Sequence, residues 1–173
     1  MRDPSSFDDF YHGCAKRVTS HIHAMVGSLA EAEDIVQDAF TKAWQHWDKI
    51  SHYADPEAWV RTVAFRIQVS RWRKASNRIR AHRRHGLPAD EPALSPDYVA
   101  IIAALRKINV GQRQAIVLHY LVGLSIDEIA DETGVAAGTV KARLSRGRQA
   151  LATHLSDLAP QIRPIATEVS NDG

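Results

Sequence analysis

The sequence predicts an all-α protein: two small helical domains joined by a flexible linker, with a helix-turn-helix in the second domain. Three observations lead to this fold class. Apolar residues recur at helical spacing in nearly every segment, and none shows the long two-residue alternation of a strand. That periodicity fails from 76 to 96, where three prolines and a glycine occur among basic residues. It then resumes, and residues 124–151 combine a helix-start signal, a glycine and a basic helix.

The first domain, residues 5–75, is expected to be a bundle of amphipathic helices. They are expected at Phe7–Val26, Leu29–Trp47 and Trp59–Lys74. Gly27 follows the first helix and ends it, and the second helix carries the strongest apolar stripe of the chain. Asp55 and Pro56 open the third, because an N-cap carboxylate followed by proline in the first turn is a typical helix start. A linker is expected at 76–95.

The second domain, residues 96–158, is expected to contain helices at Asp97–Ile108 and Gly111–Leu121 before the helix-turn-helix. Ser125 and Glu128 have the spacing of a capping box, which satisfies free N–H groups at a helix start. Gly134 suits the tight turn, because a glycine adopts positive φ without strain. Val140 and Leu144 then place an apolar stripe on the next helix and are expected to face inward. Residues 159–173 are expected to form a disordered tail.

Composition excludes several classes of protein. Cys14 is the single cysteine, so neither an internal disulfide nor a cysteine-based zinc framework is possible. No apolar run approaches the roughly 20 residues that a membrane span needs, so we expect no membrane association. The net charge of +2 conceals a strong asymmetry: residues 61–84 hold nine Lys or Arg and no acidic residue. Such a basic segment is typical of a protein that binds nucleic acid.

The sequence contains no signature of an enzyme. It lacks GxxxxGK[ST], GxSxG and HExxH, so we expect no catalytic residue and no cofactor. Its nine histidines do not form a metal motif. His21 and His23 are two residues apart, so on a helix they point to different sides and cannot bind one ion together. The histidines are therefore interpreted as scattered surface residues, and no metal is expected.

The helix-turn-helix segment is polarised in charge. Its first helix carries acidic residues on the outer face, at Asp127, Glu128, Asp131 and Glu132, whereas 135–151 contains no acidic residue at all. A basic second helix suits a phosphate-lined major groove, while the first helix braces it. A plain helical hairpin with a solvated basic face is the alternative. The small Ala130, the turn at Gly134 and the inward Val140 favour the helix-turn-helix.

The Trp59–Lys74 helix combines aromatic and basic residues in a pattern typical of single-stranded nucleic-acid binding. Its expected core stripe is Val60, Val63, Ala64 and Ile67. Beside that stripe, a second face collects Arg61, Phe65, Gln68 and Trp72, with further cations at Arg66, Arg71, Arg73 and Lys74. Rings stack on unpaired bases while cations follow the phosphates. In the alternative interpretation, the two aromatic rings pack under the linker and the arginines only solubilise the helix.

Three segments together resemble one family. They are AEDIVQDAFTKAW (32–44), DPEAWVRTVAFRIQVSRWRK (55–74) and ALRKINVGQRQAIVLHYLVGLSIDEIA followed by GTVKARLSRGRQAL. In this order, over about residues 7–155, the chain resembles the extracytoplasmic-function (group IV) sigma factors of bacterial RNA polymerase. The resemblance implies a protein that directs core polymerase to promoters and helps melt −10 DNA. It also implies a cytoplasmic, nucleoid-associated location.

The resemblance implies roles for particular residues. Docking on the β′ clamp helices of core polymerase falls to Asp34, Gln37, Asp38 and Thr41, and the β flap is a further contact of the family. The −10 element falls to Trp59, Arg61, Phe65, Arg66, Gln68, Trp72 and Arg73. The −35 element falls to Thr139, Lys141, Ala142, Arg143, Ser145, Arg146 and Arg148. Promoter DNA, core polymerase and an anti-sigma factor are the implied partners.

One position departs from the family pattern. Arg66 stands where the family commonly has Asn, and it only donates hydrogen bonds, whereas Asn both donates and accepts. The family's usual −10 preference is therefore not expected here. A stand-alone helix-turn-helix regulator is the alternative function. It explains residues 124–151 equally well, but not the aromatic basic helix in a separate domain, nor the polar face from Asp34 to Gln45.

Overall fold

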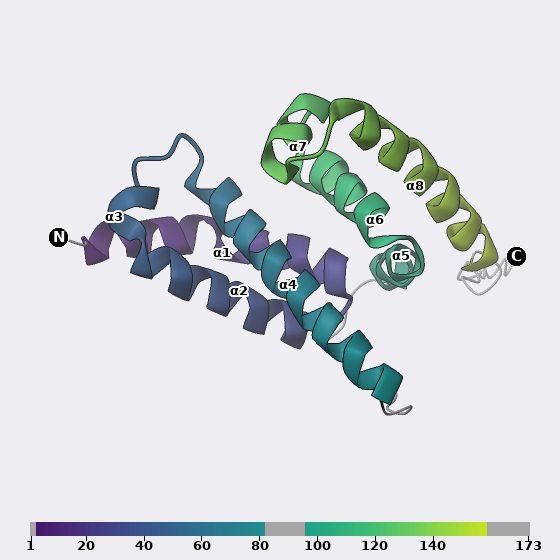
Figure 1. The fold of residues 1–173 in the computed structure, drawn as a ribbon, viewed down its shortest axis with the longest axis horizontal. Coiled ribbons are helices and arrows are strands. Elements are labelled where there is room, and N and C mark those ends of the chain that lie inside the picture. Colours follow the sequence, from purple (N-terminus) through teal and green to yellow (C-terminus); the bar gives the residue numbers. More distant parts are fainter. Residues whose placement is uncertain (1–2, 82–95, 159–173) are drawn as a thin grey trace, which may run out of the picture.

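The computed structural model describes residues 3–81 and 96–158, and the described residues are helical, with no strand among them. They form two bodies that pack against each other (Figure 1). The first body, residues 3–81, consists of α1 (Pro4–Val26), α2 (Leu29–Gln45), α3 (Trp47–Ile50) and α4 (Pro56–Ala81). The second body, residues 96–158, consists of α5 (Pro96–Lys107), α6 (Val110–Ile116), the π-helix η1 (Val117–Val122), α7 (Ile126–Thr133) and α8 (Ala137–Leu158). The predicted all-α class is confirmed.

The core of the first body lies between α1, α2 and α4. Its buried residues include Val18, Ile35, Phe40, Val60 and Ala64, so the apolar stripes that the periodicity predicts do face inward. At one end of this core the rings of Phe7, Phe10, Phe40 and Trp47 pack together, with the Phe10 and Trp47 ring centroids 4.9 Å apart. Large aromatic surfaces buried in this way hold α1 and α2 together.

In the first body the predicted end of α1 and the predicted start of α4 are confirmed, whereas α2 ends at Gln45 instead of Trp47 and the unpredicted short helix α3 follows it. Gly27 has φ 81° and ends α1, and Asp55 accepts a hydrogen bond of 2.9 Å from the N–H group of Ala58 at the start of α4. The helix α4 continues to Ala81, into the segment assigned to the linker. Residues 75–81 contain neither glycine nor proline, so no residue interrupts the helix there. The rest of the expected linker and the expected tail lie outside the described residues.

The second body has its own core, built around the helix-turn-helix. Ile129, Val140 and Leu144 are buried there, as the sequence predicts. Ser125 and Glu128 form the predicted capping box, and Gly134, with φ 68°, ends α7. The helix predicted at Gly111–Leu121 instead divides into α6 and the π-helix η1, which ends at Gly123.

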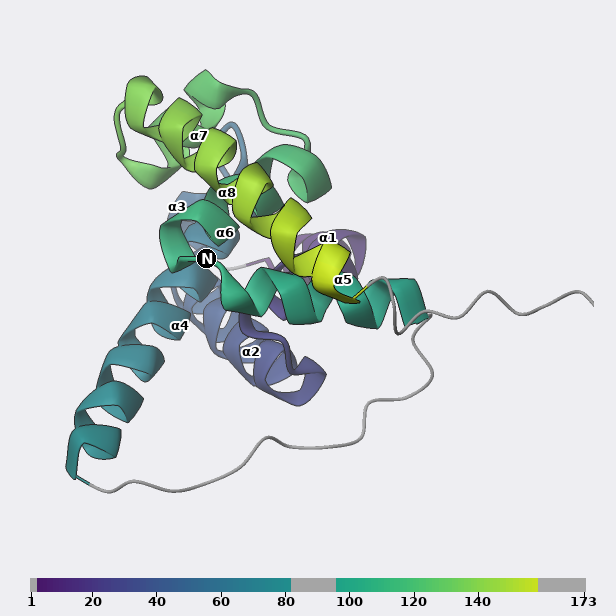
Figure 2. The same ribbon diagram turned by 90° about the vertical axis from the view of Figure 1, so that its right-hand side faces the viewer.

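The two bodies share part of their interior. Ala24 and Met25, at the end of α1, belong to the core of the second body, and Figure 2 shows that end of α1 next to α5. Arg113 of α6 donates a hydrogen bond to the main-chain carbonyl of Met25. This contact satisfies one of the free carbonyls at the end of a helix. The second body therefore covers the end of α1.

This contact corrects the interpretation of two histidines. His21 and His23 are 6% and 3% exposed, so they are interior residues rather than surface ones. The Tyr98 hydroxyl lies 3.3 Å from Nδ1 of His23. The helical period places these positions on α1 correctly, but only the contact between the bodies buries them. Among the described residues no cluster fits a metal ion, and none of the helices there has the length and apolarity of a membrane span.

Candidate nucleic-acid interface

The second helix of the helix-turn-helix, α8, presents an open basic surface. Val140 and Leu144 are buried, which turns the opposite side of α8 outward. The exposed side chains of the predicted −35 set are Thr139, Lys141, Ser145, Arg146 and Arg148, and Ala142 is half-buried. Gly147 lets α8 approach α6 closely, because a Cβ atom at this position would lie 2.8 Å from Cδ1 of Ile116. The packing of α8 therefore fixes which of its side chains reach solvent.

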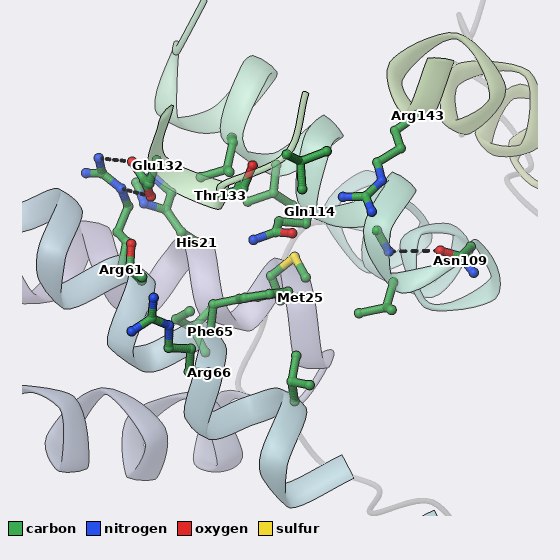
Figure 3. Close-up of a pocket in the computed structure, with 18 residues that line it drawn as sticks. His21, Met25, Arg61, Phe65, Arg66, Asn109, Gln114, Glu132, Thr133 and Arg143 are labelled. Atoms are coloured by element: carbon green, nitrogen blue, oxygen red, sulfur yellow. Dashed lines mark hydrogen bonds and ion pairs between the residues drawn. The ribbon is translucent and has the colours of Figure 1, made fainter. Parts of the chain in front are cut away.

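Two arginines of α8 are directed differently from the rest of the predicted set. Arg148 donates a hydrogen bond of 3.2 Å to the hydroxyl of Tyr120, a residue of η1 that is 53% exposed. Arg143 is half-buried and reaches toward Gly111 at the start of α6, where it lines a cavity (Figure 3). The structure thus brings Lys141, Ser145 and Arg146 together on the exposed face of α8.

The second body covers part of the predicted −10 face of α4, at Arg61 and Phe65. Arg61 and Gln68 are 6% and 7% exposed, and Phe65 packs against the core of the second body. Trp72, on the same face, is 61% exposed, and Arg66 and Arg73 are exposed as well. The two aromatic rings of this predicted face therefore lie in different surroundings, Phe65 against the second body and Trp72 in solvent. The cover comes from helices far away in the sequence, which the periodicity of α4 does not reveal.

Trp59, the remaining member of the −10 set, belongs mainly to the first body. It is half-buried and packs against the core there, with its ring 6.4 Å from the ring of His46. The core stripe itself is as predicted, because Val60 and Ala64 are fully buried and Ile67 packs beside them.

Arg61 is the centre of an ion-pair network that joins the bodies. Its Nη2 and Nε atoms donate to the two carboxylate oxygens of Glu132 of α7, at 2.9 and 3.3 Å. Asp55 and Glu57 of its own body lie 3.4 and 3.3 Å from the same guanidinium. Burial alone would lower the pKa of Arg61, but the carboxylates around it outweigh burial and raise that pKa. The guanidinium is therefore charged, and its bidentate pair with Glu132 is of the strong kind.

A cavity of about 410 Å³ lies beside this network, between the two bodies. Its lining includes His21, Met25, Phe65, Arg66, Val117 and Arg143 (Figure 3). Burial, and next the charge of Arg61, lower the pKa of His21, so the imidazole is held neutral. The two bodies therefore contact each other around a cavity instead of along a fully packed surface.

The predicted docking face of α2 is open. Asp34, Gln37, Asp38 and Thr41 are all exposed, and Phe40 is buried on the other side of the helix, as expected. The carboxylate of Asp38 accepts a hydrogen bond of 2.7 Å from Arg71 of α4. Figure 1 shows α2 on the side of the first body that faces away from the second. This face is therefore accessible, while the predicted −10 face is partly covered.

Residues that the sequence interpretation passed over hold the two bodies together. Glu132 was assigned to a solvated acidic face, and no role was assigned to Arg113 or Tyr98. The only local signal is the position of Glu132 at the end of α7, where an acidic residue is unfavourable for the helix dipole. Cys14 has no part in this interface: burial, and next the charge of Glu57, raise the pKa of its thiol to about 11, so it is unreactive.

Comparison with known proteins follows the same division into two bodies. Residues 10–78 match the family Sigma-70 region 2, and residues 98–151 match the family Sigma-70, region 4. The chain is 35% identical over 141 residues to the ECF RNA polymerase sigma factor SigL of Mycobacterium tuberculosis, covering 78% of this chain and 80% of SigL. It is 27% identical over 175 residues to the ECF RNA polymerase sigma factor SigW of Bacillus subtilis, covering 90% and 92%.

Two solved structures have the same fold. The sigma factor RpoE from Bartonella quintana, in complex with the anti-sigma factor NepR, superimposes with a TM-score of 0.77 at 27% identity, over 87% of this chain and 96% of RpoE. CnrH, in complex with the cytosolic domain of CnrY, superimposes with a TM-score of 0.64 at 22% identity, over 90% of each chain. The likeness to RpoE extends over both bodies.

Proposed function

This chain belongs to the ECF RNA polymerase sigma factors, and we propose that it divides promoter recognition between its two bodies. The second body reads duplex −35 DNA through α8, and the first docks on core polymerase and supports melted −10 DNA through α4. The observation that carries this proposal is the pair of basic helices, one in each family-matched body, with carboxylates absent from their DNA-facing sides. Both helices offer the cations that binding to phosphates requires.

For the −35 element, we assign base contacts to Lys141, Ser145 and Arg146, which share the exposed face of α8. Thr139 lies in the first turn, where helix N–H groups and the hydroxyl favour a phosphate. Arg148 is held by Tyr120 at the edge of this face, which suits a phosphate rather than a base. Arg143 joins the interface only if it turns out of the cavity that it lines.

For the −10 element, Arg66, Trp72 and Arg73 are the residues available at once, because they are exposed on α4. Trp72 offers an open ring on which an unpaired base can stack. Arg61 and Phe65 join the surface once the second body has moved away, and Gln68 lies on the same helix as a buried neighbour. Arg66 only donates hydrogen bonds, and this sets the base preference of this protein apart from that of family members with Asn at this position.

For docking, the open face of α2 supports contact with the β′ clamp helices, and the β flap is the proposed contact of the second body. Asp34 is the cleanest probe, because Asp38 is already paired with Arg71. The complex of RpoE with the anti-sigma factor NepR supports an anti-sigma factor as a further partner. We propose that the protein acts in the cytoplasm, at the nucleoid, as a regulator without enzymatic activity.

The stand-alone regulator is disfavoured, because the family match to region 2 covers residues 10–78, which such a protein does not need. The deciding experiment mixes the purified chain with bacterial core RNA polymerase and measures co-elution. It then maps the transcripts that the complex starts on a pool of genomic fragments. We expect a stoichiometric complex and a small set of shared start sites, and Asp34→Lys weakens complex formation without a change in the circular dichroism spectrum. If the chain bound DNA but never core polymerase, the assignment would be wrong.

A further inference from the structure

Arg61 has two incompatible tasks in this protein. It is a member of the proposed −10 surface, yet its guanidinium is 6% exposed and occupied by Glu132 of the other body. The two donors that hold the Glu132 carboxylate, at 2.9 and 3.3 Å, have the fork geometry that also binds a phosphate. A guanidinium in this geometry cannot serve a carboxylate and a phosphate through the same two N–H groups.

The surroundings of the pair make this competition specific. Phe65, one turn along α4 from Arg61, packs against the core of the second body, so the same contact removes a stacking surface and a phosphate ligand together. The exposed fraction of the Glu132 side chain is 11%, so the pair is shielded from screening by salt. By contrast, the docking face of α2 and the reading face of α8 are both open. The contact between the bodies thus covers Arg61 and Phe65 of α4 and leaves the docking face of α2 and the reading face of α8 open.

We propose that the Arg61–Glu132 pair is an autoinhibitory latch in which Glu132 occupies the place of a −10 phosphate. This proposal rests on the proposed function of α4. With the latch closed, the chain is able to meet core polymerase through α2 and duplex DNA through α8, but it does not hold single-stranded −10 DNA. Release of Glu132 frees the Nε and Nη2 donors that held its carboxylate and uncovers Phe65 in one step, while Asp55 and Glu57 stay beside the guanidinium. A phosphate of the DNA strand then takes the place of Glu132. Melting of DNA is thereby coupled to separation of the bodies.

The latch is one of several contacts between the bodies, and the remaining contacts decide how a latch variant behaves. Away from the latch, Arg113 holds the carbonyl of Met25 and Tyr98 lies beside His23. Loss of the latch alone therefore loosens one end of the contact and shifts the population toward separated bodies, instead of unfolding either core. A ligand or variant shifts such an equilibrium only by its differential effect on the two states.

The experiment uses the full chain and the variant Glu132→Gln, which removes the charge and nearly keeps the shape. Spin labels at exposed positions, His52→Cys in the first body and Gln149→Cys in the second, report the distance between the bodies. Binding is measured with a fluorescent single strand of mixed sequence, about 12 nucleotides long, within the range that one binding surface covers. A duplex of mixed sequence measures the open face of α8. We expect a broader and longer distance distribution, single-strand affinity raised on the order of tenfold, and duplex affinity unchanged.

Asp131→Asn is the matched control, because it removes the same charge from the same helix at an exposed position. It should change neither the distance nor the preference for single strands. If Glu132→Gln left both the distance and single-strand binding at the level of Asp131→Asn, the latch would be disproved. If the bodies separated without a gain in single-strand binding, Arg61 would not be a phosphate ligand, and the exchange would be disproved too. Glu132→Asp keeps the charge and serves as the milder variant, with an intermediate result expected. Co-elution with core polymerase tests the function separately.

Discussion

The helices α4 and α8 are both basic, and the sequence predicts a DNA-facing side for each, yet the structure treats the two sides oppositely. The side of α8 with Lys141 and Arg146 is open to solvent, whereas the side of α4 with Arg61 and Phe65 lies under another body. Local composition identifies which residues suit nucleic acid. Whether they are available depends on the packing of helices distant in the sequence, and that packing offers a point of control.

The largest expected effect comes from removing the cation on the covered side. Arg61→Ala leaves Glu132, Asp55 and Glu57 facing one another without their common partner. Breaking a buried ion pair costs about 3–5 kcal/mol, and the lower end applies because Asp55 is half-exposed. Arg146→Ala, on the open side, should change the free energy of unfolding by less than about 0.5 kcal/mol. Urea unfolding of both variants checks this contrast, and equal losses would mean that the two sides do not differ.

The two aromatic residues of α4 sharpen the same comparison within one helix. Phe65→Ala should destabilise the closed arrangement, because its ring packs on the second core. Trp72→Ala should leave the free energy of unfolding nearly unchanged, because its ring is 61% exposed, but should cost about 1–3 kcal/mol of single-strand binding. Thermal unfolding and fluorescence anisotropy separate the two effects. A Trp72→Ala protein that unfolds would instead make that ring a structural residue.

On the open side, Arg146 and Arg148 test whether α8 reads sequence or only charge. Arg146→Ala should weaken −35 binding by about 1–3 kcal/mol and relax the preference at one base pair, if the guanidinium contacts a base. Arg148→Ala should weaken all duplexes alike and reduce the salt slope by about one unit. Binding to single-base variants at two salt concentrations distinguishes them. Identical behaviour of the two variants would contradict their separate roles.

The smallest expected effect is on the pH dependence of the contact. The pKa of His21 is lowered by burial and next by Arg61, with Arg17 in the same direction and Glu57 and the Leu121 backbone opposing. The unfolded or separated protein therefore takes up the proton first as the pH falls below about 6.5, and the closed arrangement loses stability there. The loss stops growing once the pH is below the pKa of the folded protein. Unfolding followed from about pH 7.5 to about pH 5.5 should show this slope, and His21→Gln should flatten it.

The sequence predicts those features that depend on neighbouring residues. The capping box of Ser125 and Glu128, the turn at Gly134 and the N-cap at Asp55 involve residues no more than four positions apart, and all are as predicted. The inward stripes follow from the helical period for the same reason. The pairing of Arg61 with Glu132 joins residues 71 positions apart, and no local pattern records it. For the same reason the helical period could not reveal that His21 and His23 are interior residues.

The presence of Ala24 and Met25 in the core of the second body limits how this protein can be recombined. A chimera that takes residues 96–158 from one relative and the remainder from another would join two halves of a single interior. The packing around Met25, and the carbonyl that Arg113 holds, would then come from different parents. If the last turn of α1 is taken from the same relative as the second body, the residues that form these contacts come from one parent protein. The exchangeable unit is therefore discontinuous in the chain, and its boundary within the first body lies before Ala24.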